Sequence, residues 1–377
     1  MPTHFAAVAT AKGQPFEVQA RPTPKPGPGE LLVAVKSVAI NPADGHMREL
    51  GLFISNYPTV IGFDMAGLVL EVGEGVPTDA GAHDSRPSFQ PGVTRIAAFT
   101  ASFWREWGPN YGAFQERCLV PWQHAVILPD DLSWNHAATL PVSVEVPLNA
   151  WDVLGIPRIH DPDTFARVSA GKSSKKEALL IWGASSSVGS MGVQTARLLR
   201  DDPSSAFGAV YATAGSANQS YVTSLGADSV FDYKSPDVVD SIVTAAKKDG
   251  LIIRHCFLAT GQLAPCQAVL KAFIGDSLAG SSPTTAKIAS APVIPTDAAA
   301  VGGVETIFVL PSMVESERLE QFRYWIGTFL RTNLVKGVIK PSPEPTIVGG
   351  GLSVVNYGVD RILQGVSCTK LVVELAE

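Results

Sequence analysis

The stretch LLIWGASSSVGSMGVQTARLL, from Leu179 to Leu199, passes from a short apolar block through small residues into a helical pattern. In a doubly wound sheet, the turn after the first strand must let the backbone approach a pyrophosphate, and the next helix must point its N-terminal amides at it. The residues that meet this need are Gly183, Ser185, Ser186, Ser187 and Val188. The pattern predicts a dinucleotide site, although a tight packing turn without a ligand fits the same residues.

Downstream of about residue 150, strand-like and helix-like blocks alternate. The apolar segments ALLIW, AVYAT, SVFDY, LIIRHCFLAT, SLAGSS and TIFVL are the expected strands, and amphipathic stretches separate most of them. Such alternation predicts a parallel sheet with helices on both faces. Because the quoted turn follows the first strand, as a dinucleotide fingerprint requires, we interpret it as the cofactor site.

The N-terminal part of the chain has a different pattern of predicted secondary structure. From Phe5 to about Leu128, short β segments are interrupted by Pro and Gly, which predicts a β-rich, barrel-like unit. The closing stretch VVNYGVDRILQGVSCTKLVVEL indicates a helix, a turn and a strand, and that strand needs partners in the first unit. We therefore expect an α/β protein, with a doubly wound parallel sheet in residues 151–330 and a β-rich domain made of residues 1–150 and 331–377.

Composition narrows the class further. A chain of 377 residues with 46% hydrophobic and 17% charged residues is long enough for two globular domains. A net charge of -6 offers no field for nucleic acid or an anionic membrane, and no apolar run is long enough for a membrane span. The four cysteines are widely spaced and the start lacks the basic segment of a signal peptide, which favours a cytoplasmic setting.

The end of the second strand indicates which dinucleotide binds. An acidic side chain there holds the ribose hydroxyls of NAD, but none occurs from Ala209 to Tyr221. Its absence favours NADP(H), and Ser216 and Asn218 can donate hydrogen bonds to the 2'-phosphate, unless they only form the turn. Tyr233, which ends the next strand, is expected to line the adenine site.

Several motifs occur in the order of a known superfamily. The segments PKPGPGELLVAVKSVAINPAD, YPTVIGFDMAGLVLEVGEGV, YGAFQE, GASSSVGSMGVQTAR, LGADSVFDY and QGVSCTKLVVEL resemble the medium-chain dehydrogenase/reductase superfamily over nearly the whole chain. Within it, NPADGHM, YPTVIGFDMAG and TIFVL are most similar to a fungal group of trans-acting enoyl reductases and zinc-binding-dehydrogenase-like relatives. The resemblance implies a GroES-like catalytic domain and a Rossmann NADP(H)-binding domain, with nicotinamide and substrate between them.

The resemblance also bears on whether the protein binds a catalytic zinc. Zinc alcohol dehydrogenases of this superfamily use a Cys in the opening hairpin and a His and a Glu in the second signature. At these places the chain has the thiol-free segment from Asn41 to Asp44, and Phe63 with Asp64. Because a catalytic zinc needs three suitable protein ligands, we expect no metal.

The resemblance implies a set of site residues. Ser185, Ser186, Ser187 and Val188 would contact the pyrophosphate or ribose, Gly215, Ser216 and Asn218 the 2'-phosphate, and Tyr233 the adenosine side. The nicotinamide end would be lined by Ala43, Ser281 or Ser282, Ser367 and Cys368. The substrate pocket would be bordered by Ser143, Thr306, Ile307 and Phe308.

The acid group is less determined. His46 is the candidate proton donor because an imidazole donates a proton near neutral pH, but a surface or cofactor-positioning role fits it equally. Asp44 either orients His46 or caps the hairpin. The aromatic residues Trp104, Trp107 and Tyr111 either form a rim over the site or cover core.

These residues favour an NADPH-dependent reductase of the C=C bond of an α,β-unsaturated carbonyl or enoyl thioester, including a trans-acting enoyl reductase of polyketide biosynthesis. Hydride transfer would need no metal. An NADPH quinone oxidoreductase and a non-catalytic NADPH-binding sensor or scaffold are the alternatives. A carrier-bound acyl substrate and a polyketide synthase are the implied partners, and the chain is expected to be a monomer or a homodimer.

Overall fold

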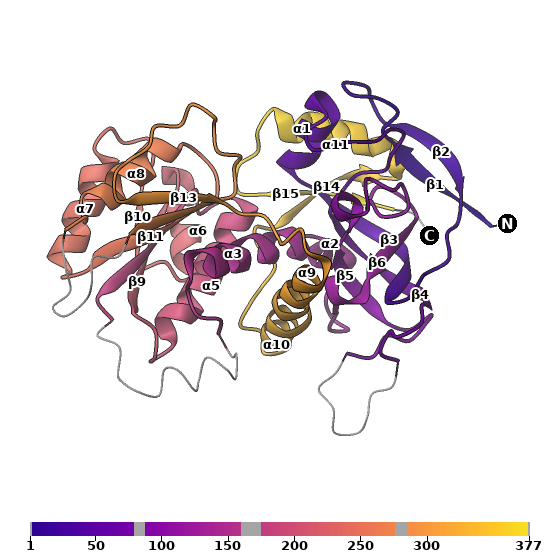
Figure 1. Ribbon diagram of the computed structural model, residues 1–377, viewed down its shortest axis with the longest axis horizontal. Coiled ribbons are helices and arrows are strands. Elements are labelled where there is room, and N and C mark those ends of the chain that lie inside the picture. The colour runs from indigo at the N-terminus through magenta and orange to yellow at the C-terminus, as the bar shows by residue number, and fades with distance from the viewer. Residues whose placement is uncertain (1, 79–86, 160–174, 276–284, 376–377) are drawn as a thin grey trace. The chain divides into compact units, whose positions relative to one another are not determined.

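The computed structural model describes residues 2–78, 87–159, 175–275 and 285–375 (Figure 1). The chain forms two compact units, one of Met1–Val142 with Ser312–Glu377 and one of Ser143–Pro311. These limits differ from the expected ones because residues 312–330 belong to the first unit, where Phe322 stacks on His124 with ring centroids 3.8 Å apart. None of the helices within the described ranges has the length and hydrophobicity needed to span a bilayer.

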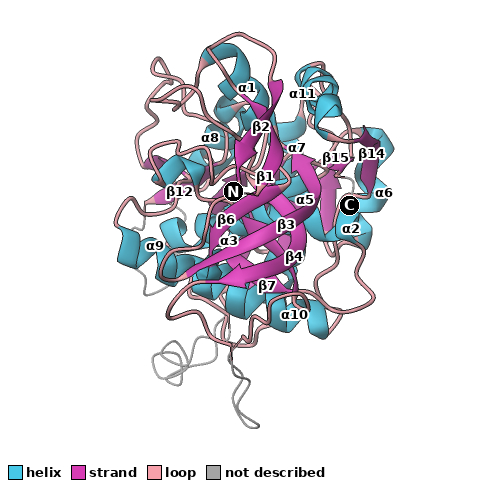
Figure 2. Ribbon diagram, turned by 90° about the vertical axis from the view of Figure 1, so that its right-hand side faces the viewer, coloured by secondary structure: helices cyan, strands magenta, loops and turns pink. Residues whose placement is uncertain are grey.

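The first unit is built on a seven-stranded sheet, part of which faces the viewer in Figure 2. Its strands are β3 (Glu30–Ile40), β4 (Asp64–Val72), β5 (Arg95–Phe99), β6 (Arg117–Pro121), β7 (Ala125–Ile127), β14 (Pro345–Gly350) and β15 (Lys370–Glu374). The order is β14-β15-β3-β4-β5-β7, and β6 also pairs with β3. Strands β1 (Thr3–Val8) and β2 (Glu17–Pro22) form a separate antiparallel pair. The predicted return of the last strand is confirmed, because β15 pairs antiparallel with β3.

Helical segments of the first unit connect these strands. They are α1 (Pro42–Leu50), η1 (Ser102–Trp104), η2 (Trp122–His124), α2 (Trp134–Ala138), α9 (Glu315–Phe322), the π-helical η4 (Arg323–Leu330), α10 (Arg331–Val335), η5 (Leu352–Val354) and α11 (Val355–Leu363). Helix α3 (Leu140–Leu154) runs across the boundary between the units. Helix α1 is missing from the sequence-based prediction, although Asn41 at its N-cap and Pro42 at its first position are a start signal.

The second unit contains a six-stranded parallel sheet in the order β10-β9-β8-β11-β12-β13. The strands are β8 (Glu177–Trp182), β9 (Phe207–Thr213), β10 (Ser229–Phe231), β11 (Ile252–Leu258), β12 (Ala286–Ser290) and β13 (Val304–Phe308). Counted from β8, this is the 3-2-1-4-5-6 order of dinucleotide-binding folds. The predicted doubly wound sheet is confirmed.

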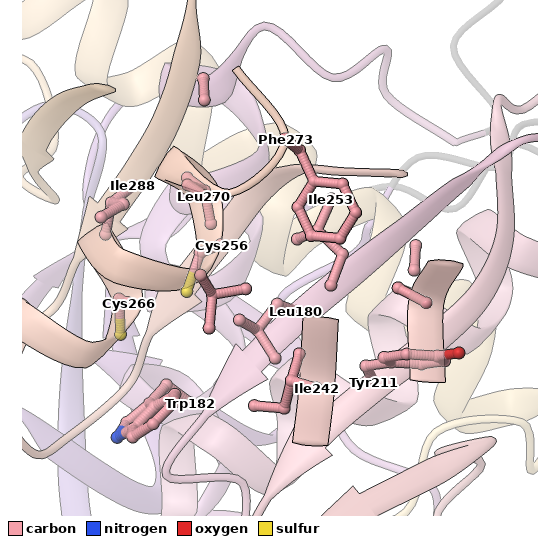
Figure 3. Close-up of a cluster of buried hydrophobic side chains, with 14 of the residues drawn as sticks. Leu180, Trp182, Tyr211, Ile242, Ile253, Cys256, Cys266, Leu270, Phe273 and Ile288 are labelled. Atoms are coloured by element: carbon pink, nitrogen blue, oxygen red, sulfur yellow. The ribbon is translucent and has the colours of Figure 1, made fainter. Parts of the chain in front are cut away.

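Helices cover both faces of this sheet. They are α5 (Ser187–Asp201), η3 (Ser216–Asn218), α6 (Gln219–Ser224), α7 (Val238–Lys248) and α8 (Leu263–Lys271). Leu180 and Cys256 belong to a core cluster with Ile242 of α7 and Leu270 of α8 (Figure 3). Successive strand residues point to opposite faces, so the next residue, Ile181, faces away from that cluster, and Gly192 of α5 packs there.

The fifth strand lies elsewhere than predicted. The segment SLAGSS, which includes Ser281 and Ser282, lies outside the described residues, and the fifth strand is β12. The physical reason is burial, because Ile288 at the centre of β12 is fully buried between β11 and β13. Within the described residues, the residue that follows β12 is Ala291.

Candidate functional site

The turn after β8 lies where the strand order of the second unit reverses. Gly183 has φ +81°, a left-handed conformation that glycine adopts without strain. A Cβ on Gly183 would come within 2.5 Å of the Thr260 Cγ2 atom, just after β11. The backbone of Gly183 is fixed by its own amide, which donates to the Thr213 hydroxyl at 3.0 Å. Ligands of open α/β sheets bind at such a switch point.

The start of α5 offers amide donors that have no partner among the described residues. The N-cap Ser186 accepts from the Gly189 amide at 3.1 Å and donates to the Gly183 carbonyl at 2.8 Å. The amides of Ser187 and Val188, the first two residues of the helix, have no intrahelical partner. A helix of 15 residues adds its positive end to these donors. The turn is therefore suited to a pyrophosphate, and the half-buried Ser185 stands beside it.

The ends of β9 and β10 come together next to this turn. A Cβ on Gly215, after β9, would lie 3.7 Å from the Tyr233 ring, after β10. Ser216 is exposed and Asn218 is half-buried in η3. The structure thus brings the predicted Gly215, Ser216 and Tyr233 to one edge of the sheet.

Lys234 is a residue of this corner that the sequence analysis missed. It is exposed, and its Nζ lies 5.8 Å from the centroid of the Tyr233 ring. The sequence signal that could have found Lys234 is its position next to Tyr233, just beyond β10. It supplies a cation at the place where the loop after β9 itself has none.

In the first unit, a buried polar network surrounds Asp64 at the start of β4. The Asp64 Oδ2 atom lies 2.9 Å from the Lys370 ammonium and accepts from the Asn41 side-chain amide at 3.0 Å. Its Oδ1 atom accepts from the Val142 backbone amide at 2.7 Å. Lys370 also donates to the Asn41 Oδ1 atom at 2.5 Å. One carboxylate therefore joins the β3–α1 turn, the start of α3 and the start of β15.

Asp44 caps α1 and does not contact His46 through any hydrogen bond recorded in the described residues. Its Oδ2 accepts from the Asn41 amide at 2.7 Å, which favours the capping role over the orienting one. Its Oδ1 is buried without a partner among the described residues. Burial, with a smaller repulsion from Asp64, raises the pKa of Asp44 to about 7. His46 is exposed on α1, and Ala43 is half-buried one turn before it.

Helix α11, which precedes the other predicted residues of the first unit, packs against α1. A Cβ on Gly45 of α1 would meet the Leu363 side chain, at the end of α11, at 2.6 Å. The turn that follows α11 carries Ser367, which is exposed, and Cys368, which has φ +51°. Burial raises the pKa of the Cys368 thiol.

The predicted substrate residues lie in the second unit. Ser143 is buried at the start of α3, near Glu145, which is also buried and accepts from the Asn149 side chain at 3.1 Å. Thr306, Ile307 and Phe308 are half-buried on the edge strand β13. The carboxyl end of β13, where Phe308 lies, shares its edge of the sheet with the Gly183 turn because the strands are parallel.

The donor set of the first unit does not fit a catalytic zinc. In the described ranges no three His, Cys, Asp or Glu side chains gather in a way that could hold a metal ion. The position next to Asp64 is Phe63, whose ring contacts Phe99 with centroids 5.4 Å apart. Both oxygens of Asp64 are already engaged by protein donors.

Comparison with known proteins agrees with this geometry. Residues 27–130 match the Alcohol dehydrogenase GroES-like domain family. The crystal structure of an alcohol dehydrogenase superfamily protein from Novosphingobium aromaticivorans superposes with a TM-score of 0.72 at 20% identity, covering 99% of this chain and 100% of that one. This likeness shows the fold, a GroES-like domain and a parallel α/β domain of the kind found in medium-chain dehydrogenases/reductases.

The closer relatives are fungal. Trans-enoyl reductase tndF of Aspergillus flavipes is 38% identical over 376 residues, which cover 99% of each chain. Trans-enoyl reductase tazE of Aspergillus terreus is 40% identical over 318 residues, which cover 84% of this chain and 94% of the relative. The chain belongs to this family of fungal trans-enoyl reductases.

Replacing Asp44 by Asn should separate capping from ionisation. The folded-state pKa of Asp44 is raised above that of the unfolded chain, so the native state loses stability as pH rises between about 4 and 7, by up to about 1.4 kcal/mol per pH unit. Asp44→Asn keeps an acceptor for the Asn41 amide but cannot ionise, so its unfolding free energy should fall less between pH 5 and pH 7. Denaturant titration at pH 5 and at pH 7 measures the unfolding free energy of the wild type and of the variant. Equal pH slopes for the two proteins would contradict the assignment, and Asp44→Ala should cost about 1 kcal/mol more than Asp44→Asn because it loses the cap.

Removing Lys370 should be costly only while Asp64 stays charged. Lys370→Met leaves a buried carboxylate without its cation, and breaking a buried pair in this way costs about 3–5 kcal/mol. The double variant Asp64→Asn with Lys370→Met should recover much of that loss. Unfolding free energies of the two single variants and the double variant form the cycle, and strictly additive effects would show that the two groups are not coupled.

Proposed function

We propose that this protein uses NADPH to reduce the C=C bond of an α,β-unsaturated acyl thioester and serves a polyketide synthase as a trans-acting enoyl reductase. The observation that carries the proposal is the Gly183 turn, with its two free amides at the head of α5, in a chain whose relatives are trans-enoyl reductases. The polyketide context rests on those relatives.

The second unit supplies the groups that would hold the cofactor. Ser187 and Val188 would donate their amides to the pyrophosphate, and the half-buried Ser185 stands beside them. The backbone comes close because Gly183 has no Cβ. NADPH, when bound, supplies the hydride that adds to the β-carbon of the substrate.

The charges around the ends of β9 and β10 favour NADPH over NADH. No carboxylate follows β9 before Tyr221, so nothing there would repel a 2'-phosphate. Gly215 leaves room beside the Tyr233 ring, and Ser216 is an exposed donor. Lys234 next to that ring would neutralise part of the phosphate charge.

The first unit would act on the substrate side without metal. The side chains around Asp64 do not fit zinc, and the positive charge beside the Asp64 carboxylate is that of Lys370. The substrate's own carbonyl can accept the charge that develops when hydride adds. His46, exposed on α1, is the candidate group for returning a proton to the α-carbon, and it can exchange protons directly with water.

The direct test is turnover with a small enoyl thioester. The protein should reduce crotonyl-pantetheine with NADPH, and the loss of NADPH fluorescence measures this turnover. The variant Gly183→Ala should bind NADPH at least about tenfold more weakly, because a displaced turn loses hydrogen bonds to a charged group. Gly250→Ala is the matched control, since Gly250 also has positive φ but no neighbour within 4 Å of the added Cβ. Turnover of quinones and not of the thioester would refute the proposal, as would tight NADPH binding without turnover of either.

Lys234→Ala should weaken NADPH binding and leave NADH binding unchanged. An exposed lysine contributes about 1 kcal/mol to such a contact, so the Kd for NADPH should rise about fivefold. Lys248→Ala, at the far end of α7, is the control for removal of one positive charge. Isothermal titration with each dinucleotide measures the Kd, and an equal change for NADH would exclude a contact with the 2'-phosphate.

A further inference from the structure

The first unit contains a pocket that the cofactor residues do not explain. Its volume is about 390 Å³, within the usual range of small-molecule sites. Its lining combines aromatic rings with charged side chains of both signs: Phe53, Phe103, Trp104, Trp107, Arg105, Arg318, Glu106 and Glu315. They come from the loop after α1, from the segment around η1 and from α9. The pocket is therefore built by loops that join core elements, as binding sites often are.

Aromatic rings form the walls of this pocket. The Phe103 ring packs edge-on against Phe53, Trp104 and Trp107, with centroids 5.7, 5.3 and 5.9 Å apart. From Trp104 the ring contacts continue through Phe99 at 5.8 Å to Phe63, the neighbour of Asp64. The pocket is thus connected by packed rings to the network that holds α1.

Two donors in the wall lack acceptors. Arg318 is only 4% exposed, and its guanidinium lies 5.0 Å from the centroid of the Trp104 ring. Its Nε atom and the Trp104 Nε1 atom are buried without hydrogen-bond partners among the described residues. Glu315 is 3.0 Å from Arg105 but 3.8 Å from Arg318, so Arg318 is the less well neutralised of the two. An acceptor that reached the Arg318 Nε and Trp104 Nε1 atoms would satisfy these two donors.

The backbone around the pocket is strained. Among the described residues, five that are not glycine have positive φ, and three of them line this pocket, namely Phe53, Glu106 and Trp107. Hydrogen bonds hold them there, because the Trp107 indole donates to the Phe53 carbonyl at 2.7 Å and Thr59 donates to the Trp107 carbonyl at 2.5 Å. Such strain persists where the surrounding structure enforces it, and it gathers at binding sites.

We infer that this aromatic pocket binds a planar, conjugated acyl chain that carries an oxygen acceptor. Flat rings on several sides favour an sp² chain, which stacks on them, over a flexible saturated one. The buried donors of Arg318 and Trp104 select a chain with a carbonyl or carboxylate oxygen. The naming of an acyl chain rests on the proposed function, and the pocket thereby sets the substrate class of the reductase.

Binding of free acids tests the pocket without turnover. The full-length protein is titrated calorimetrically with sorbate, a conjugated dienoate, and with hexanoate, the saturated acid of equal length. Sorbate should bind about fivefold more tightly, since a ring contact contributes about 1 kcal/mol. Phe103→Leu, which keeps an apolar side chain but removes the flat ring, should abolish this preference.

Trp104→Phe isolates the hydrogen bond, because it keeps a ring and removes the indole N–H. Sorbate affinity should fall about fivefold, as expected for one hydrogen bond. Trp134→Phe is the matched control, because Trp134 also carries a stacked guanidinium, that of Arg95 at 4.2 Å, but lies outside the pocket. Failure of sorbate to bind, or equal affinity in wild type, Phe103→Leu and Trp104→Phe, would overturn the inference.

Turnover separates this inference from the proposed function. If crotonyl-pantetheine is reduced but both pocket variants reduce sorboyl-pantetheine with the wild-type kcat/KM, the reductase function stands and the pocket inference fails. If sorbate binds with the expected losses in the variants but no thioester is reduced, the pocket stands and the reductase function fails. When both hold, the variants should lower kcat/KM for the sorboyl thioester about fivefold.

Discussion

The first unit depends on one buried carboxylate, Asp64. A carboxylate out of contact with water is strongly unfavourable unless charge and hydrogen bonds replace its solvation. Lys370, the Asn41 side chain and the Val142 amide supply that replacement from three separate segments. The same contacts fix where α1, α3 and β15 begin, so the need to solvate one group positions the segments that carry the predicted nicotinamide-side residues.

The turn after β8 in the second unit follows the opposite rule, because two amides there have no partner among the described residues. At the head of α5 the N-cap Ser186 satisfies the Gly189 amide, while the amides of Ser187 and Val188 stay available. Gly183 makes the turn before them possible, since any side chain there would collide with Thr260. A site that gains its missing hydrogen bonds only from a ligand has a physical reason to bind an anion.

The cation beside Asp64 also bears on the chemistry. Zinc-dependent members of the superfamily place a metal near the second signature, whereas here the carboxylate is paired with the Lys370 ammonium and its neighbour Phe63 packs against Phe99. The aromatic contacts that start at Phe63 lead to the pocket around Phe103. The described residues of this region therefore present an ion pair and a set of flat apolar walls.

The sequence by itself determined the α/β class, the parallel sheet and the turn at Gly183, because small residues between a buried strand and an amphipathic helix form a local pattern. The sequence also shows that no acidic residue follows β9 before Tyr221, which is the basis of the predicted preference for NADP(H). Only the tertiary structure decided that Asp64 pairs with Lys370, that Lys234 lies beside Tyr233, and that α9 belongs with the first unit. The fifth strand was placed wrongly for the same reason, since burial of Ile288 depends on β11 and β13 on either side of it. These contacts join residues far apart along the chain, and no periodicity within a single segment records which distant partner will satisfy a buried charge or cover an apolar face.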